Sequence, residues 1–364
     1  MGKLDKDRYL KELSVQFCIA AGHMPFIEVL VSSIADLSDS PEILTDLDVL
    51  GLSTSGDGAL TRTLFDCKSS GKMSAINRAF WARGVSEYAG CVDAVVLLKN
   101  RPIHNHRISA LAMGVDLHDE NSFVDLGRTL DAAFPQRVLY QSSLDNWDSL
   151  TLAYGKYPWA DELYGTLRNA APLTKNPSAT FRRVIAEFKS VRGELDPAKK
   201  EHVAIYLDSV STLLALWTPM GRDIRRFFDP KMTKADFEKL LRYYLWGGKE
   251  SYRIRQRLKE VSPQENGNGA GPIELPAWAQ LVGIAGLFVA APQHLLSSAI
   301  ICREVALRTL VGSDAVLDAN LNRLVEANGR YRQFAAAMCD YGVLAAGLPK
   351  ALGAAVQKLI LSPT

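Results

Sequence analysis

Residues 43–68 read ILTDLDVLGLSTSGDGALTRTLFDCK, and this stretch decides the fold of the first third of the chain. Its first part, 43–53, is rich in Leu and Val and is typical of a strand. Residues 53–58 carry the Ser, Gly and Asp of a turn. Residues 60–67 alternate and hold β-branched and aromatic side chains, which indicates a partner strand. The stretch therefore predicts a hairpin whose loop has several residues.

Charged side chains lie on this hairpin where its strand ends are neighbours. Asp48 lies inside the first strand and Asp66 at the end of the second, so the two carboxylates can converge. Asp66 and Lys68 are two residues apart and point to the same face of a strand. The side chain of Cys67 points the other way, into the core, which leaves its backbone carbonyl available as a further ligand.

The flanking sequence predicts alternating helices and short strands. Pro25 favours a helix start, and we expect a helix over 26–37 that carries Glu28. Residues 93–98 are almost wholly apolar, as in a strand buried on both faces. These elements predict a small central mixed sheet flanked by helices. The remaining predicted elements are helices over 4–21, 73–88, 105–113 and 122–134 and a strand over 115–117.

Carboxylates beside a lysine suit phosphodiester hydrolysis. A divalent ion polarises the phosphate and activates the attacking water, and Mg²⁺ prefers carboxylate oxygens. A nearby lysine can orient the water and offset the charge that develops on the phosphate. Asp48, Asp66 and Lys68 supply such groups, and Glu28 can reach the same place.

The motif TDLDVLG…LFDCKSSGK resembles the core of the PD-(D/E)xK nuclease superfamily, which has the restriction-endonuclease-like fold. That family has a helix glutamate, an aspartate in a strand, (Asp/Glu)-x-Lys in the next strand, and then a helix packed on the sheet. Here Glu28 resembles the helix glutamate, Asp48 the strand aspartate and residues 66–68 the D-x-K element. Either Asp46 or Asp48 could be the ligand, and we prefer Asp48 because Val49-Leu50-Gly51 follow it as in the family. Asp46 would then lie beside the metal ligands without binding the ion itself.

The resemblance implies a metal-dependent endonuclease that acts on DNA, with RNA as the alternative. Glu28, Asp48, Asp66 and the backbone of Cys67 would hold Mg²⁺ or Mn²⁺, and Lys68 would position the water. A homodimer or a protein partner is expected by analogy, as is a role in phage defence or in a mobile element. The alternative is a catalytically inactive nuclease-fold scaffold that acts as an interaction or regulatory subunit.

After Pro135 strand signals nearly vanish, and the rest of the chain predicts a large all-α region. We divide the chain into a nuclease-like domain (1–135), a basic helical domain (136–262) and a C-terminal helical region (273–364), with 261–272 as the linker. Residues 275–291 are uncharged but short for a membrane span, and they predict a buried core helix. We expect no membrane association.

The distribution of charge along the chain indicates a polyanionic binding partner. The net charge is only +2, but residues 175–260 hold 19 Lys and Arg against 11 Asp and Glu. Tyr252 and Trp246 are candidate stacking groups beside these cations, although a solvated helix face would show the same pattern. The predicted nucleic-acid contacts are Arg78, Arg222, Arg225, Arg226, Lys249, Arg253, Arg255 and Arg257.

Cysteine use and the N-terminus indicate a cytoplasmic location. The five cysteines are far apart and form no Cys-x-x-Cys, which fits buried thiols in a reducing compartment. The first residues, MGKLDKDRYLKEL, are polar and charged, so we expect no signal peptide.

Overall fold

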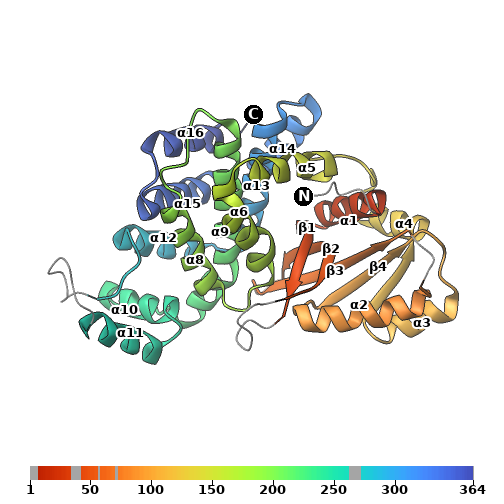
Figure 1. Cartoon of the computed structure of the whole chain (residues 1–364), viewed down its shortest axis with the longest axis horizontal. Helices are drawn as coiled ribbons and strands as arrows, with labels where there is room; N and C mark the ends of the chain where they lie inside the picture. Colours follow the sequence, from red (N-terminus) through yellow and green to blue (C-terminus); the bar gives the residue numbers. More distant parts are fainter. Residues whose placement is uncertain (1–6, 34–41, 56–57, 70–72, 262–271, 364) are drawn as a thin grey trace.

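The computed structural model describes residues 7–33, 42–55, 58–69, 73–261 and 272–363 and has two parts, a mixed sheet with its helices and a helical remainder (Figure 1). The elements of the first part are α1 (Arg8–Ala20), β1 (Met24–Ser32), β2 (Ile43–Thr54), β3 (Leu60–Lys68), α2 (Ala75–Ala89), β4 (Asp93–Leu98), α3 (His104–Leu111), β5 (Val115–Asp119) and α4 (Glu120–Leu130). The predicted central mixed sheet is therefore confirmed.

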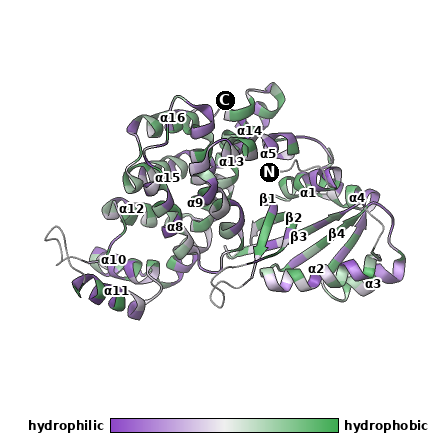
Figure 2. Ribbon diagram, viewed as in Figure 1, coloured by the Kyte–Doolittle hydropathy of each residue, from purple (hydrophilic) through white to green (hydrophobic). Residues whose placement is uncertain are grey.

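The sheet has the strand order β1-β2-β3-β4-β5. Strands β1, β2 and β3 pair antiparallel, and β2 and β3 form the predicted hairpin. Strands β3, β4 and β5 pair parallel, which requires crossover connections, and α2 and α3 provide them. The strands are largely hydrophobic through the middle of the sheet (Figure 2).

Helices cover both faces of this sheet (Figure 1). On one face α1 and α4 pack through a cluster that includes Leu13, Phe65 and Phe123. On the other face α2 and α3 pack through Ala79 and Ala110. Strand β4 lies between the two layers with Ala94–Leu97 buried, as its apolar sequence predicts.

The predicted helix over 26–37 is wrong, because residues 24–32 form strand β1. Pro25 suggested a helix start, but it lies in an edge strand opposite Gly51, a position where the missing N–H is tolerated. Ile27, Val29 and Val31 are β-branched and buried, and pairing with β2 decides their conformation. Residues 34–37 of the predicted helix lie outside the described residues.

The second part is mostly helical. Its longer helices are α5 (Leu144–Gly155), α8 (Pro177–Ser190), α9 (Lys200–Phe227), α10 (Lys234–Leu245), α11 (Lys249–Val261), α12 (Trp278–Ala290), α13 (Leu295–Val311), α14 (Ala315–Ala327), α15 (Tyr331–Ala346) and α16 (Lys350–Leu361). Shorter helical segments lie before or between them: η2 (Tyr140–Ser142), η3 (Pro158–Ala160), α6 (Asp161–Gly165), η4 (Thr166–Ala170), α7 (Ala171–Leu173) and η5 (Pro292–His294). Helix α9 is the central element, since nearly all of its first 20 residues are buried.

Within the described residues, one helix is long and apolar enough to cross a membrane, and a bent pair of helices is a second such segment if it is one span. The single helix is α9, and 94% of its apolar window is buried inside the structure. The bent pair joins α12 to the residues 292–311, with a 94° bend between them. The predicted buried helix over 275–291 corresponds to α12, whose Leu281, Ile284 and Phe288 are buried. A core helix passes the same test, so these segments give only weak support for a membrane span.

The two parts share one hydrophobic core. Met24 and Phe26 of β1 belong to the same buried cluster as Leu213 of α9 and Val305 of α13. The proposed boundaries near 135 and 262 stay predictions, and the predicted linker lies almost wholly outside the described residues.

Candidate active site

The sheet opens between β2 and β3 at one end. The registered pairs of these strands stop at Val49 and Phe65. Beyond that point β2 stays with β1, where Leu47 still faces Val29, and β3 stays with β4 as far as Lys68. The opening frees backbone groups that a closed ladder would use, and it places side chains of both strands around one gap.

Asp48 lies in this gap. Its Oδ2 accepts a hydrogen bond from the backbone N–H of Cys67 at 2.8 Å and another from Lys68 Nζ at 2.9 Å. Lys68 Nζ also lies 3.5 Å from Asp66 Oδ1. The structure therefore brings Asp48, Asp66 and Lys68 together, as the hairpin geometry indicated. The thiol of Cys67 is buried and contacts Ser14 Oγ at 3.3 Å, so it faces the core as predicted.

Glu28 reaches the site from β1 and not from a helix. It lies between Ile27 and Val29, which pair with Val49 and Leu47, so it stands opposite Asp48. Its φ is 54°, a left-handed conformation that is strained for a residue with a side chain. Such strain often accompanies a functional position.

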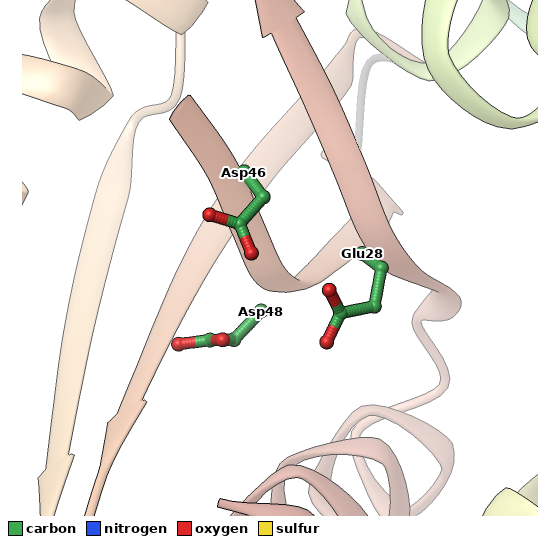
Figure 3. A group of neighbouring side chains, drawn as sticks. All are labelled: Glu28, Asp46 and Asp48. Carbon is green, nitrogen blue, oxygen red and sulfur yellow. The ribbon is translucent and has the colours of Figure 1, made fainter. Parts of the chain in front are cut away.

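Three carboxylates form a compact group on β1 and β2 (Figure 3). Oxygen atoms of Glu28, Asp46 and Asp48 all lie within 4.8 Å of one another. Asp46 is exposed, whereas Asp48 is only 4% exposed. From the sequence we expected Asp46 to lie beside the metal ligands without binding the ion, but the structure places its carboxylate within this group. Asp66 lies outside it.

Lys11 of α1 is a site residue that the sequence analysis missed. Its ammonium forms ion pairs with Glu28 and with Asp48, the latter at 3.1 Å, and the residue is 3% exposed. It shares a helix face with Ser14 and Cys18 at i+3 and i+7, and both are buried. This spacing could have indicated Lys11 from the sequence. A lysine on the same helix face as small residues that are typically buried is expected to face the sheet.

Arg78 of α2 pairs with Asp66 through two of its three guanidinium nitrogens, Nε and Nη2. The guanidinium also lies 3.9 Å from the centre of the Trp81 ring. Asp66 is 1% exposed, so this bidentate pair compensates a buried charge. In the structure Arg78 holds Asp66, and its expected contact with nucleic acid stays a prediction.

The charges in the site shift one another's pKa values. Burial opposes the charge on Lys11 and Lys68, but the neighbouring carboxylates outweigh it and raise the pKa of both. Burial also disfavours the Asp48 carboxylate, yet the two lysines and the Cys67 N–H outweigh it and lower the Asp48 pKa. At Asp66 burial dominates and raises the pKa, although Arg78 acts against it. Both lysines are therefore protonated at neutral pH, and Asp48 is ionised.

The basic residues of the helical part do not adjoin this site. Arg222, Arg225 and Arg226 lie at the end of α9. The other four, Lys249, Arg253, Arg255 and Arg257, are exposed on α11, at the far end of the molecule from the sheet (Figure 1). Because α11 is helical, Lys249, Arg253 and Arg257 follow one another at i+4 along one face, and Arg255 points to the opposite side.

The expected stacking groups make contacts within the protein. Trp246 lies 4.5 Å from the Arg182 guanidinium and 5.4 Å from that of Arg255, measured to the ring centre. Tyr252 packs edge-on against Tyr243, with 5.5 Å between ring centres. These aromatic groups thus brace α10 and α11 in the described structure.

Comparison of the chain with protein-family models, curated proteins and solved structures gave no match.

Proposed function

We propose that the chain is a metal-dependent nuclease of the PD-(D/E)xK type. One observation carries the proposal: Asp48 of β2 and the D-x-K residues of β3 converge where these two strands separate. Helix α2 follows β3 and packs on the sheet, which agrees with the family order. One position departs from that order. The first helix contributes Lys11, and the glutamate of the site comes from β1.

The donor atoms of the site fit a hard divalent ion. Glu28, Asp46 and Asp48 offer only carboxylate oxygens, which Mg²⁺ and Mn²⁺ accept, and they would hold the ion. When bound, such an ion polarises the phosphate and lowers the pKa of a water. The backbone carbonyl of Cys67 stays a predicted further ligand, and Asp66 acts through its contacts with Lys68 and Arg78.

Lys68 acts in this proposal as a hydrogen-bond donor and a positive charge. Its ammonium is fixed between Asp48 and Asp66, and its pKa is raised, so it holds its proton at neutral pH. A protonated amine cannot remove a proton from water. It can donate to a water or to a phosphate oxygen and stabilise negative charge there. Arg78 keeps Asp66 in place and thereby positions Lys68.

The inactive scaffold is a second candidate, and the ion pairs of the site favour it. Every predicted acidic ligand already has a protein cation: Lys11 for Glu28, Lys68 for Asp48 and Arg78 for Asp66. A site compensated in this way is stable without a metal. In that case the sheet part would be a scaffold, and the helical part would bind the partner.

A cleavage assay separates the two candidates. Supercoiled plasmid, single-stranded DNA and RNA would be incubated with the protein in Mn²⁺, in Mg²⁺ and in EDTA. We expect metal-dependent cleavage that is lost in Asp48→Asn and Lys68→Ala. The matched control is Asp93→Asn, an exposed carboxylate at the opposite end of the sheet, which should cleave normally.

Equal cleavage by the wild type and the site variants would assign the activity to another site or to a contaminant. Absence of cleavage combined with a melting temperature that Mn²⁺ does not change would support the scaffold. The preferred substrate in a positive assay would decide between DNA and RNA. The homodimer, the cytoplasmic location and the role in phage defence stay predictions.

A further inference from the structure

A cavity lies between the sheet and the helical part, at the loop end of the β2–β3 hairpin. Its volume is about 370 Å³, at the small end of the range of about 300–1,000 Å³ that is usual for ligand pockets. Phe26, Leu52 and Leu60 supply apolar lining from the sheet, and Leu216 supplies it from α9. The hairpin carries Asp48 and Asp66 at its other end, so this cavity is separate from the candidate active site.

Arg62 of β3 is a partly buried cation that lines the cavity. It donates from Nε to the carbonyl oxygen of Pro172 at 2.6 Å and from Nη2 to that of Thr174 at 2.7 Å. Both partners are neutral, and across the described ranges no carboxylate forms an ion pair with Arg62. A guanidinium removed from water gains most from an anionic partner, and the cavity beside it has room for one.

Two further groups at the same wall favour an anion. Lys175 lines the cavity and is exposed, next to the start of α8. Helix α8 has 14 residues and begins with Pro177, which lines the cavity, so the N-terminal end of the helix lies beside it. The N-terminal end of a helix carries partial positive charge and is a common phosphate site. Arg222 of α9 adds a third basic side chain to the lining, and among the described lining residues Asp223 alone carries a carboxylate.

Helix α9 contributes a hydrogen-bond acceptor. Pro219 lies inside the helix and has no N–H, so the carbonyl of Ala215 receives no helical hydrogen bond from that position. Ala215 and Pro219 both line the cavity. A ligand with a hydroxyl or an N–H group could donate to this carbonyl.

We propose that this cavity binds a small organic phosphate of about the size of a mononucleotide. Arg62, Lys175 and the α8 N-terminus hold the phosphate, the apolar wall of Phe26 and Leu52 contacts the organic part, and the Ala215 carbonyl accepts from it. The bound molecule would bridge the β2–β3 hairpin and the helical part, because its lining comes from both. This site is independent of the proposed nuclease activity.

Calorimetry and thermal melting of the full chain in EDTA test the proposal. EDTA removes metal-dependent binding at the candidate active site. The probes are adenosine 5′-monophosphate, ribose 5-phosphate, glycerol 3-phosphate, adenosine and inorganic phosphate. We expect saturable binding and a rise in melting temperature with at least one phosphate ester, and at least tenfold weaker binding of adenosine and of inorganic phosphate.

Three variants locate the site, and one controls for charge. Lys175→Ala should weaken binding at least fivefold, Arg62→Met should abolish it, and Ala215→Leu should abolish it by filling the cavity without removing a charge. Lys189→Ala, an exposed lysine at the other end of α8, should bind normally. If Arg62→Met does not fold, the other two variants carry the test. The proposal is overturned if no ester binds saturably, if inorganic phosphate binds as tightly, or if Lys175→Ala and Ala215→Leu bind like the wild type.

Discussion

Lys11 occupies the oxygens that a metal ion would use. Its ammonium pairs with Glu28 and Asp48, two of the three carboxylates in the compact group. A divalent ion bound to these oxygens must therefore compete with the lysine. The lysine stabilises the metal-free fold and lowers the affinity of the same site for metal, and these two effects can be measured separately.

Replacement of this lysine should have opposite effects with and without metal. In EDTA, Lys11→Met should lower the free energy of unfolding by about 2 kcal/mol. This is less than the roughly 3–5 kcal/mol of a fully broken buried pair, because Asp48 keeps Lys68. In Mn²⁺ the variant should gain more stability than the wild type, because the Lys11 ammonium no longer competes for the oxygens of Glu28 and Asp48. Urea unfolding in both buffers measures this.

The control for this experiment is Lys99→Met, an exposed lysine just after β4. It should match the wild type in both buffers. If Mn²⁺ stabilises Lys11→Met no more than it stabilises the wild type, the carboxylate group is not a metal site.

The pair of Arg78 and Asp66 should show strong coupling. Arg78→Met leaves an almost fully buried carboxylate with only Lys68, 3.5 Å away, as its cation and should lower the free energy of unfolding by about 3 kcal/mol. The double variant Asp66→Asn/Arg78→Met should cost less than the sum of the two single changes. Urea unfolding of the four proteins gives the coupling. Arg83→Met, which breaks an exposed pair with Glu87 on the same helix, should cost under about 0.5 kcal/mol. Additive single changes would contradict the pairing.

At the scale of elements, the hairpin could be predicted from sequence because its signals are local. Alternation in 60–67 and the turn residues 53–58 act within the segment, and β2 and β3 pair as expected. Strand β1 could not be predicted in this way. Pro25 gives a local helix signal, whereas the strand conformation depends on pairing with β2, which begins 11 residues after β1 ends.

The same contrast between local signals and long-range packing explains which site residues could be predicted from the sequence. Asp48, Asp66 and Lys68 were found because one hairpin carries all three. Lys11 comes from another helix, and only the packing of α1 on the sheet brings it to Asp48. The opening of the sheet at Val49 and Phe65 is likewise a property of four strands together, and no single segment indicates it.

Helices α13 and α14 and the turn η2 meet at Asp318. Its carboxylate accepts from Arg308 Nε at 2.6 Å and Nη2 at 2.9 Å, and from the Tyr140 hydroxyl at 2.7 Å. The Arg308 hydrogen bonds, with the help of Ser313 and Tyr140, lower the pKa of Asp318 to about 2. This carboxylate thus ties three elements together in its ionised form.

The stabilisation from Asp318 should depend on pH in a defined direction. The folded-state pKa of about 2 lies below the ordinary 3.8, so the contribution is complete above about pH 4 and is lost as the pH falls through about 2. Asp318→Asn should therefore cost about 2 kcal/mol at pH 7. The difference between variant and wild type should shrink toward pH 2. Urea unfolding at pH 7, 4 and 2.5 would show it. Asp125→Asn, at an exposed pair on α4, should show no such trend, and a constant difference at Asp318 would contradict the assignment.

At the scale of the whole molecule, one buried ionic network joins the sheet to the helical part. Arg303 of α13 is fully buried and donates to Asp208 Oδ1 of α9 at 2.9 Å and to the Pro25 carbonyl of β1 at 3.1 Å. Arg168 and Tyr154 donate to the other oxygen of Asp208, at 3.1 and 2.8 Å. A single carboxylate thus serves two buried guanidinium groups, and one of these also holds an edge strand.

Because one carboxylate pairs with two arginines in this network, removing the carboxylate should destabilise the protein more than removing one arginine. Asp208→Asn leaves two buried arginines without an anion and should lower the free energy of unfolding by about 4 kcal/mol. Arg303→Met should cost less, because Asp208 keeps Arg168 and the methionine fills part of the space beside Phe26. Urea unfolding of both variants, with the exposed Glu194→Gln as control, measures the order. A larger cost for Arg303→Met would mean that its contacts with Phe26 and the Pro25 carbonyl, and not the ion pair, hold the two parts together.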